Sequence, residues 1–167
     1  MKRALVSLAL LLAAWTVPAG AAELRAFTPD SLAAIQVKYA GRPFILSLWS
    51  ANDCVHCITE LTLFGKLAKS RPRLPLVLVA TDGMEHAASA QQIQKRHGLT
   101  RIDSWMFDDP IPERLRQTID PGWYGDIPRT YLYDAQHRRE TVVGVLGEQK
   151  LKAWIRKQNL SKQTSTD

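Results

Sequence analysis

The chain has 167 residues, with 22 Lys or Arg and 16 Asp or Glu, so its formal net charge is +6. This length suits one domain with its own core, and the sequence shows no internal repeat, low-complexity block or second domain. The modest excess of positive charge does not indicate a nucleic-acid partner. We expect solvated faces at the basic residues before one strand and near the C-terminus, which are Arg71, Arg73, Lys150, Lys152, Arg156 and Lys157.

Residues 1–21 have the layout of a secretory signal peptide. Lys2 and Arg3 precede an apolar stretch over residues 4–15, and small residues at 18–21 supply a cleavage site. The apolar stretch is shorter than the roughly 20 residues that a membrane-spanning helix needs, so cleavage is favoured over an uncleaved anchor. The sequence therefore predicts an exported, periplasmic protein.

Hydrophobic periodicity and turn residues predict alternating strands and helices beyond this segment. Thr28 as N-cap and Pro29 at the first helical position begin a helix that ends near Gly41. The elements expected after it are strands over 43–49, 74–80, 104–107, 129–134 and 140–146, and helices over 58–67, 85–97, 112–119 and 147–159. This order predicts an α/β domain over residues 22–160, followed by a frayed polar tail over 161–167. Its mixed central sheet would have four to five strands flanked by helices.

The only two cysteines, Cys54 and Cys57, lie between the strand over 43–49 and the following helix. Unpaired N–H groups and the positive dipole at a helix N-terminus stabilise a thiolate and lower its pKa. The spacing also lets one sulfur attack the other to form a disulfide. A purely structural crosslink is the weaker interpretation, because closing so short a loop adds little stability. We therefore expect thiol–disulfide exchange.

Other uses of a C-x-x-C pair are less well supported by the neighbouring residues. Haem attachment requires His directly after the second cysteine, where this chain has Ile58. A site of the pair and His56, with His86 or His97 as a further ligand, would suit Cu(I) or zinc, but no second C-x-x-C or paired-His spacing exists. A copper chaperone that uses the same thiols without turnover is the second hypothesis, and a redox-inert binding module is the third. No residue is assigned as a metal ligand.

Four features occur together around the cysteine pair. They are the apolar run at 44–49, the pair itself, Glu60 three residues after Cys57, and the segment 126–132 with Ile-Pro-Arg-Thr before a strand. Together they resemble the thioredoxin superfamily, specifically its TlpA/ResA-like periplasmic branch, over residues 24–160. The resemblance implies a thioredoxin fold and a monomeric thiol–disulfide oxidoreductase that mostly reduces exported proteins. Apocytochrome c and metal-site thiols would be substrates, and a membrane thiol donor would supply the electrons.

The resemblance also implies roles for individual residues. Cys54 is the exposed nucleophile and Cys57 the resolving thiol, so no cofactor is expected beyond their redox-active disulfide. Glu60 is the proton-transfer group, since its spacing puts it on the same side of the helix as Cys57. Pro128 is expected to be a cis-proline that faces the disulfide, and the backbone of Ile127 to bind an extended substrate chain.

Residues next to the pair modify this pattern and leave the redox potential open. The imidazolium of His56 favours a nearby thiolate and makes the disulfide more oxidising, whereas the carboxylate of Asp53 acts in the opposite direction. Asp53 also stands where the branch usually has Trp, and the segment from Trp49 to the first cysteine is one residue longer than usual. Ser47 replaces a buried acid of thioredoxins, and Thr62 replaces a common Pro. These departures indicate a divergent member.

Overall fold

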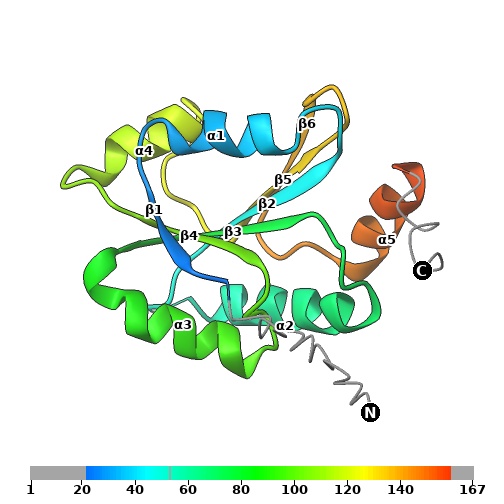
Figure 1. The fold of residues 1–167 in the computed structure, drawn as a ribbon, viewed down its shortest axis with the longest axis horizontal. Helices are drawn as coiled ribbons and strands as arrows, with labels where there is room; N and C mark the ends of the chain where they lie inside the picture. Colours follow the sequence, from blue (N-terminus) through cyan, green and yellow to red (C-terminus); the bar gives the residue numbers. More distant parts are fainter. Residues whose placement is uncertain (1–21, 53, 159–167) are drawn as a thin grey trace, which may run out of the picture.

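A computed structural model describes residues 22–52 and 54–158 and folds them around one six-stranded sheet (Figure 1). The strands are β1 (Leu24–Phe27), β2 (Phe44–Trp49), β3 (Leu76–Gly83), β4 (Asp103–Phe107), β5 (Arg129–Tyr133) and β6 (Arg139–Val143). Their order is β1-β4-β3-β2-β5-β6. The first four in this order run parallel, whereas β5 is antiparallel to β2 and β6 to β5. The predicted mixed sheet is confirmed, with six strands rather than four to five.

The strand that the sequence prediction missed is β1. It has only four residues and lies at the edge of the sheet, where it pairs with β4 alone. Its end residues, Leu24 and Phe27, are buried, and the two between them are half-buried. So short a segment without strict alternation carries too little periodicity to be recognised as a strand.

Five α-helices of the described chain cover both faces of the sheet (Figure 1). They are α1 (Ser31–Lys38), α2 (Val55–Ser70), α3 (Ala87–Arg96), α4 (Pro112–Ile119) and α5 (Glu148–Lys157). α1 and α4 lie over one face, and α2 and α3 over the other. Buried side chains form one cluster on each face, and α5 joins the cluster of α2 and α3 through Leu151, Trp154 and Ile155. The central strands β2 and β3 are buried on both faces, as their continuous apolar runs predicted.

Two helices begin later than the sequence predicted. The helix expected from Pro29 begins at Ser31, because a turn precedes it in which the Ser31 N–H donates to the Thr28 carbonyl at 3.0 Å. The third helix begins at Ala87, after a 3-10 turn over Met84–His86. The remaining predicted elements lie within a few residues of their expected bounds, and α4 has the expected bounds.

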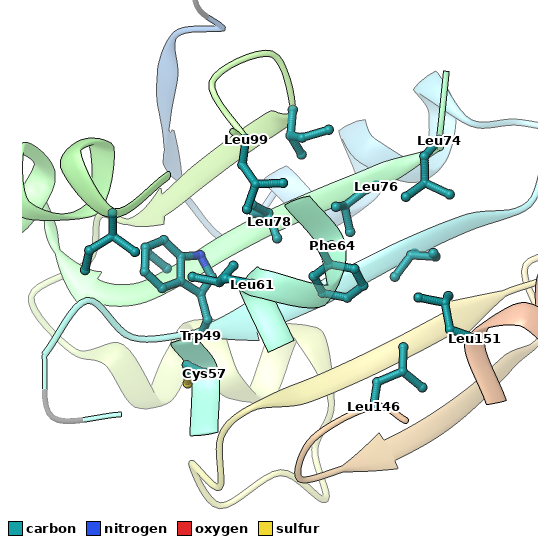
Figure 2. Packing of buried hydrophobic residues seen from close by; sticks show 14 of the residues in the cluster. Trp49, Cys57, Leu61, Phe64, Leu74, Leu76, Leu78, Leu99, Leu146 and Leu151 are labelled. Carbon is teal, nitrogen blue, oxygen red and sulfur yellow. The ribbon is translucent and has the colours of Figure 1, made fainter. Parts of the chain in front are cut away.

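The inner face of α2 packs closely against the sheet and the end of α3. Cys57, Leu61 and Phe64 lie on this buried face, beside leucines of β3 (Figure 2). Gly65 lies on the same face, where an added Cβ would stand 2.0 Å from the carbonyl oxygen of His97. Only glycine permits this approach, which fixes the position of the helix that carries the cysteine pair.

Some predicted features fall outside the described residues. These are the signal segment over 1–21, the polar tail over 161–167 and Asp53. Within the described ranges, no helix has the length and apolar character needed to cross a membrane.

Candidate active site

A disulfide joins Cys54 and Cys57 at the start of α2, just beyond the carboxyl end of β2. The two Cα atoms are 5.2 Å apart. Cys54 is the N-cap residue of α2, and its Sγ accepts a hydrogen bond from the backbone N–H of Cys57 at 3.2 Å. This donor and the positive end of the helix would both stabilise a Cys54 thiolate once the disulfide is reduced.

The two sulfurs differ in their access to solvent. Cys54 is half-buried and is followed by exposed Val55 and His56, whereas Cys57 has no exposed surface. A partner protein can therefore approach Cys54, while Cys57 is shielded by the core. The predicted roles of nucleophile and resolving thiol require this arrangement. His56 lies in the first turn of α2, and its effect on the thiolate stays a prediction, as does that of Asp53.

Glu60 lies on α2, one helical turn beyond Cys57, and is only 1% exposed. Its carboxylate accepts hydrogen bonds from the hydroxyl of Ser47 in β2 at 2.9 Å and from that of Thr130 in β5 at 3.2 Å. The backbone N–H of Leu146 donates a third at 2.9 Å. Burial raises the pKa of Glu60, and the three hydrogen bonds oppose this rise. The result is a buried carboxyl group that holds its proton to higher pH than a surface glutamate does.

The structure gives Ser47 a role that the sequence did not reveal. Ser47 is fully buried in β2, and it donates its hydroxyl hydrogen bond to Glu60. The buried carboxyl group at this end of the molecule is thus supplied by α2, and the strand contributes a donor to it.

The Ile127–Pro128 peptide bond is cis, as the resemblance implied. Pro128 is buried, Ile127 is half-buried, and both directly precede β5. In the register of β5 and β2, Arg129 lies opposite Leu48. The cis-proline loop is therefore at the same end of the sheet as the cysteine pair. The carbonyl of Pro128 accepts a hydrogen bond from the N–H of Gly144 at 2.9 Å. Substrate binding by this loop stays a prediction.

An ion-pair network that the sequence did not predict anchors this loop. Arg129 is 9% exposed and contacts Asp126 at 2.8 Å and Asp120 at 3.1 Å. The Tyr131 hydroxyl donates to Asp120 at 2.9 Å, and Arg139 pairs with the same carboxylate at 2.9 Å. The loop before the cis-proline is thereby held to β5 and β6. An arginine at the start of a strand with no other charged residue was the available signal, since arginine is almost never buried without a partner.

Asp82, also not predicted, holds the loop that leads to the cysteine pair. It lies near the end of β3, and its Oδ1 accepts hydrogen bonds from the Ser50 hydroxyl at 2.7 Å and the Asn52 amide at 3.0 Å. Its Oδ2 accepts the backbone N–H of Ala51 at 2.7 Å. These three residues belong to the segment that joins Trp49 at the end of β2 to the cysteine pair. Asp82 therefore fixes the path of this segment.

The histidines that were considered as metal ligands lie in other contacts. Nδ1 of His97 is 3.3 Å from the Thr62 hydroxyl, and Nε2 of His86 is 3.7 Å from Glu85. Within residues 22–52 and 54–158, no three His, Cys, Asp or Glu side chains are arranged to hold a metal ion. The fold therefore does not bring His86 or His97 to the cysteine pair.

Solved structures share this fold, although no family model and no curated protein sequence matches the chain. A secreted disulfide oxidoreductase of Mycobacterium tuberculosis, described as homologous to DsbE of E. coli, superposes with a TM-score of 0.56. It is 16% identical, over 72% of this chain and 85% of that one. A thiol:disulfide interchange protein of the thioredoxin family from Chlorobium tepidum superposes with a TM-score of 0.57. It is 19% identical, over 73% of this chain and 83% of that one. A DsbF homologue from Corynebacterium diphtheriae superposes with a TM-score of 0.56 and is 18% identical, over 73% of this chain and 75% of that one.

These similarities establish the class of the fold. The chain has the thioredoxin fold, with a C-x-x-C disulfide at the N-terminus of the helix that follows a central strand. The fold expected from the resemblance is therefore confirmed.

Proposed function

We propose that this protein is a thiol–disulfide oxidoreductase that exchanges disulfides with exported proteins through Cys54 and Cys57. The unequal burial of the bonded pair carries the proposal, because one sulfur is accessible at a helix N-terminus and the other is enclosed. The names of the structurally similar proteins support it, since they include a disulfide oxidoreductase and a thiol:disulfide interchange protein.

The proposed cycle starts from the reduced pair. The Cys54 thiolate attacks a substrate disulfide, forms a mixed disulfide and releases one substrate sulfur as a thiolate, which takes up a proton. The Cys57 thiol then loses its proton and attacks Cys54 Sγ, which releases the second substrate sulfur. Two electrons have passed to the substrate, and the pair is left oxidised, as in the structure. A membrane thiol donor restores the dithiol by the same two exchanges in reverse.

Glu60 is the proposed acceptor of the Cys57 proton. It lies one turn away on the same helix and is buried with its three hydrogen-bond donors, and burial raises its pKa. A carboxyl group of raised pKa is a better match to a thiol than a surface glutamate is, because proton transfer is most efficient between groups of similar pKa.

The proposed compartment is the periplasm, and the proposed direction is reduction. The first 21 residues support export, and the similar protein of Mycobacterium tuberculosis is described as secreted. Apocytochrome c and metal-site proteins are the proposed substrates, because their cysteines must stay reduced in an oxidising compartment.

Trapping of the mixed disulfide tests the proposal. In the Cys57→Ser variant the second step cannot occur, so exported partners should accumulate on Cys54 as complexes that a reductant dissolves. The controls are Cys54→Ser and the double Cys→Ser variant, which should trap nothing. Failure of Cys57→Ser to trap any partner, together with no disulfide reductase activity of the wild type, would refute the proposal. Stoichiometric retention of Cu(I) by the reduced protein without turnover would favour the copper chaperone instead.

A redox titration against glutathione or dithiothreitol tests the direction. A reduction potential near that of thioredoxin, about −270 mV, agrees with a reductase, whereas one near about −120 mV would make the protein an oxidant.

A further inference from the structure

Charged residues are segregated between the two ends of the sheet. At the amino ends of the parallel strands, the connections from helix to strand hold eight Lys or Arg and no Asp or Glu, over residues 38–43, 69–75 and 95–102. At the carboxyl ends, the segments that leave the strands hold five Asp or Glu and no Lys or Arg, over residues 28–30, 50–52, 81–86 and 108–111. The disulfide lies at this acidic end. We call the three segments over 38–43, 69–75 and 95–102 the basic edge, and they lie at the opposite end of the sheet.

Helix dipoles explain only part of the positive charge at the basic edge. Four of the eight cations lie in the last turns of α1, α2 and α3, where the negative end of the dipole favours positive charge. The other four lie beyond the helices, in the loops, and are Arg42, Arg71, Arg73 and Arg101. Arg42 donates to the carbonyl of Lys38 in the last turn of α1, so the negative helix end also favours this arginine, whereas the dipole effect falls off before Arg101.

The cations of the basic edge are mostly exposed and in excess over nearby acids. Lys38 and Arg25 share the carboxylate of Asp103, with Lys38 Nζ at 2.5 Å. Burial lowers the pKa of Lys38, and the nearby Arg25 and Arg42 lower it further, as expected where positive charge accumulates. Five exposed cations of the basic edge make no ion pair within the described residues, namely Arg42, Lys69, Lys95, Arg96 and Arg101.

The segments of the basic edge meet at a cavity of about 380 Å³. Its charged lining is Arg25, Lys38 and Arg101, together with Glu23 and Asp103. Ala22 also lines it, and the Ala22 N–H donates to the carbonyl of Thr100 at 2.6 Å. The chain therefore enters the described fold at the basic edge, directly after 21 residues that include the apolar stretch and two further basic residues.

We propose that the basic edge docks on an anionic phospholipid surface, with lipid phosphates at the unpaired cations and the cavity and with the disulfide facing away from the membrane. Charge complementarity supports this occupant, and so does the point where the chain enters. An uncleaved segment 1–21 would hold Ala22 at the membrane, and cleavage would add the α-amino group of Ala22 to the same edge. The proposal is independent of the redox chemistry.

Vesicle co-sedimentation of the full chain tests the proposal. Binding to mixed phosphatidylglycerol–phosphatidylcholine vesicles should exceed binding to phosphatidylcholine alone and should fall with salt. The double variant Lys95→Gln/Arg101→Gln should weaken binding to the anionic vesicles about 30-fold, from the contribution of two basic residues near such a surface. A second pair, Lys69→Gln/Arg96→Gln, should weaken it similarly.

The matched control is Arg114→Gln/Arg116→Gln on α4, which removes the same charge at the other end of the sheet and should leave binding unchanged. Because all three variants retain the apolar segment, any difference between them reports the basic edge. Equal binding by the Lys95/Arg101 variant and the control would overturn the proposal, as would equal binding to zwitterionic and anionic vesicles. Tighter binding to a DNA duplex than to the anionic vesicles would also overturn it, in favour of a different polyanion.

Discussion

Replacement of Glu60 by Gln should stabilise the folded protein at neutral pH and slow the second step of exchange. Gln has nearly the same shape, and its amide can still bond to Ser47, Thr130 and the Leu146 N–H, but it carries no charge. The variant therefore removes the titration of a fully buried group and leaves its packing almost unchanged.

The expected effect on stability follows from the direction of the pKa shift. Burial raises the pKa of Glu60 above its ordinary value of 4.5, so the folded state binds this proton more tightly than the unfolded state does. The stabilisation is fully present below the unfolded pKa and is lost as pH rises through the folded pKa. At a pH above both pKa values, each unit by which the folded-state pKa exceeds the unfolded-state pKa corresponds to about 1.4 kcal/mol of lost stability. The wild type should therefore lose stability relative to Glu60→Gln as pH rises from about 4.5.

Urea unfolding of the oxidised protein over a pH series measures this difference. The free energies of unfolding of the two proteins should diverge as pH rises, and Glu60→Gln should be the more stable at neutral pH. Curves that stay parallel would show that burial does not raise the pKa of this carboxyl group. A curve that favours the wild type at high pH would show that the hydrogen bonds outweigh burial.

The kinetic effect separates a proton-transfer role from a structural one. Loss of a general base slows a step by about 100-fold or more, so resolution of a mixed disulfide on Cys54 should slow by that order in Glu60→Gln at neutral pH. The deficit should shrink as pH approaches the ordinary thiol pKa of about 8.5, where Cys57 ionises without help. Stopped-flow measurement of substrate release would contradict this role if the variant resolves as fast as the wild type.

Two further predictions concern packing and the cis-proline loop. Gly65→Ala should destabilise the protein by about 1–3 kcal/mol in urea unfolding, because the added Cβ would overlap the backbone of His97. The control is Gly147→Ala, where an added Cβ meets no atom within 4 Å, and it should change stability by less than about 1 kcal/mol. Arg129→Met should cost about 1.5–3 kcal/mol, because it removes a charged hydrogen bond from the buried Asp120 carboxylate and leaves only Arg139 to neutralise that carboxylate. Arg138→Met, at a side chain that is 80% exposed, should cost less than about 1 kcal/mol. Similar losses within either pair of variants would contradict the assigned contacts.

The sequence predicted the elements whose signals are local. The run at 76–80 is apolar throughout, the run at 44–49 is apolar except for Ser47, and both are strands buried on both faces. The helix over 112–119 has Pro at its first position and two buried apolar residues one turn apart, and its bounds were predicted correctly. β1 was missed because its pairing with β4 spans some eighty residues of chain and leaves little trace in four residues.

The site was predicted only as far as its local part. The cysteine pair, Glu60 and the cis-proline follow from short motifs and a family resemblance. The partners of Glu60 do not, because Ser47, Thr130 and Leu146 are separated from it by 13, 70 and 86 residues. Nor does the role of Asp82, whose contacts are with a loop about thirty residues earlier in the chain. Contacts of this kind depend on strand order and register, which the hydrophobic pattern alone does not specify.

The stoichiometry of a single turnover tests the central claim most directly. Reduced protein is mixed with an equimolar disulfide-bonded peptide, and the Cys54–Cys57 disulfide and the peptide thiols are quantified by mass spectrometry after alkylation. A working redox centre predicts one Cys54–Cys57 disulfide for each peptide disulfide lost, with two peptide thiols released, and no reaction in Cys54→Ser. Peptide disulfides that persist beside a reduced, folded protein would contradict the account.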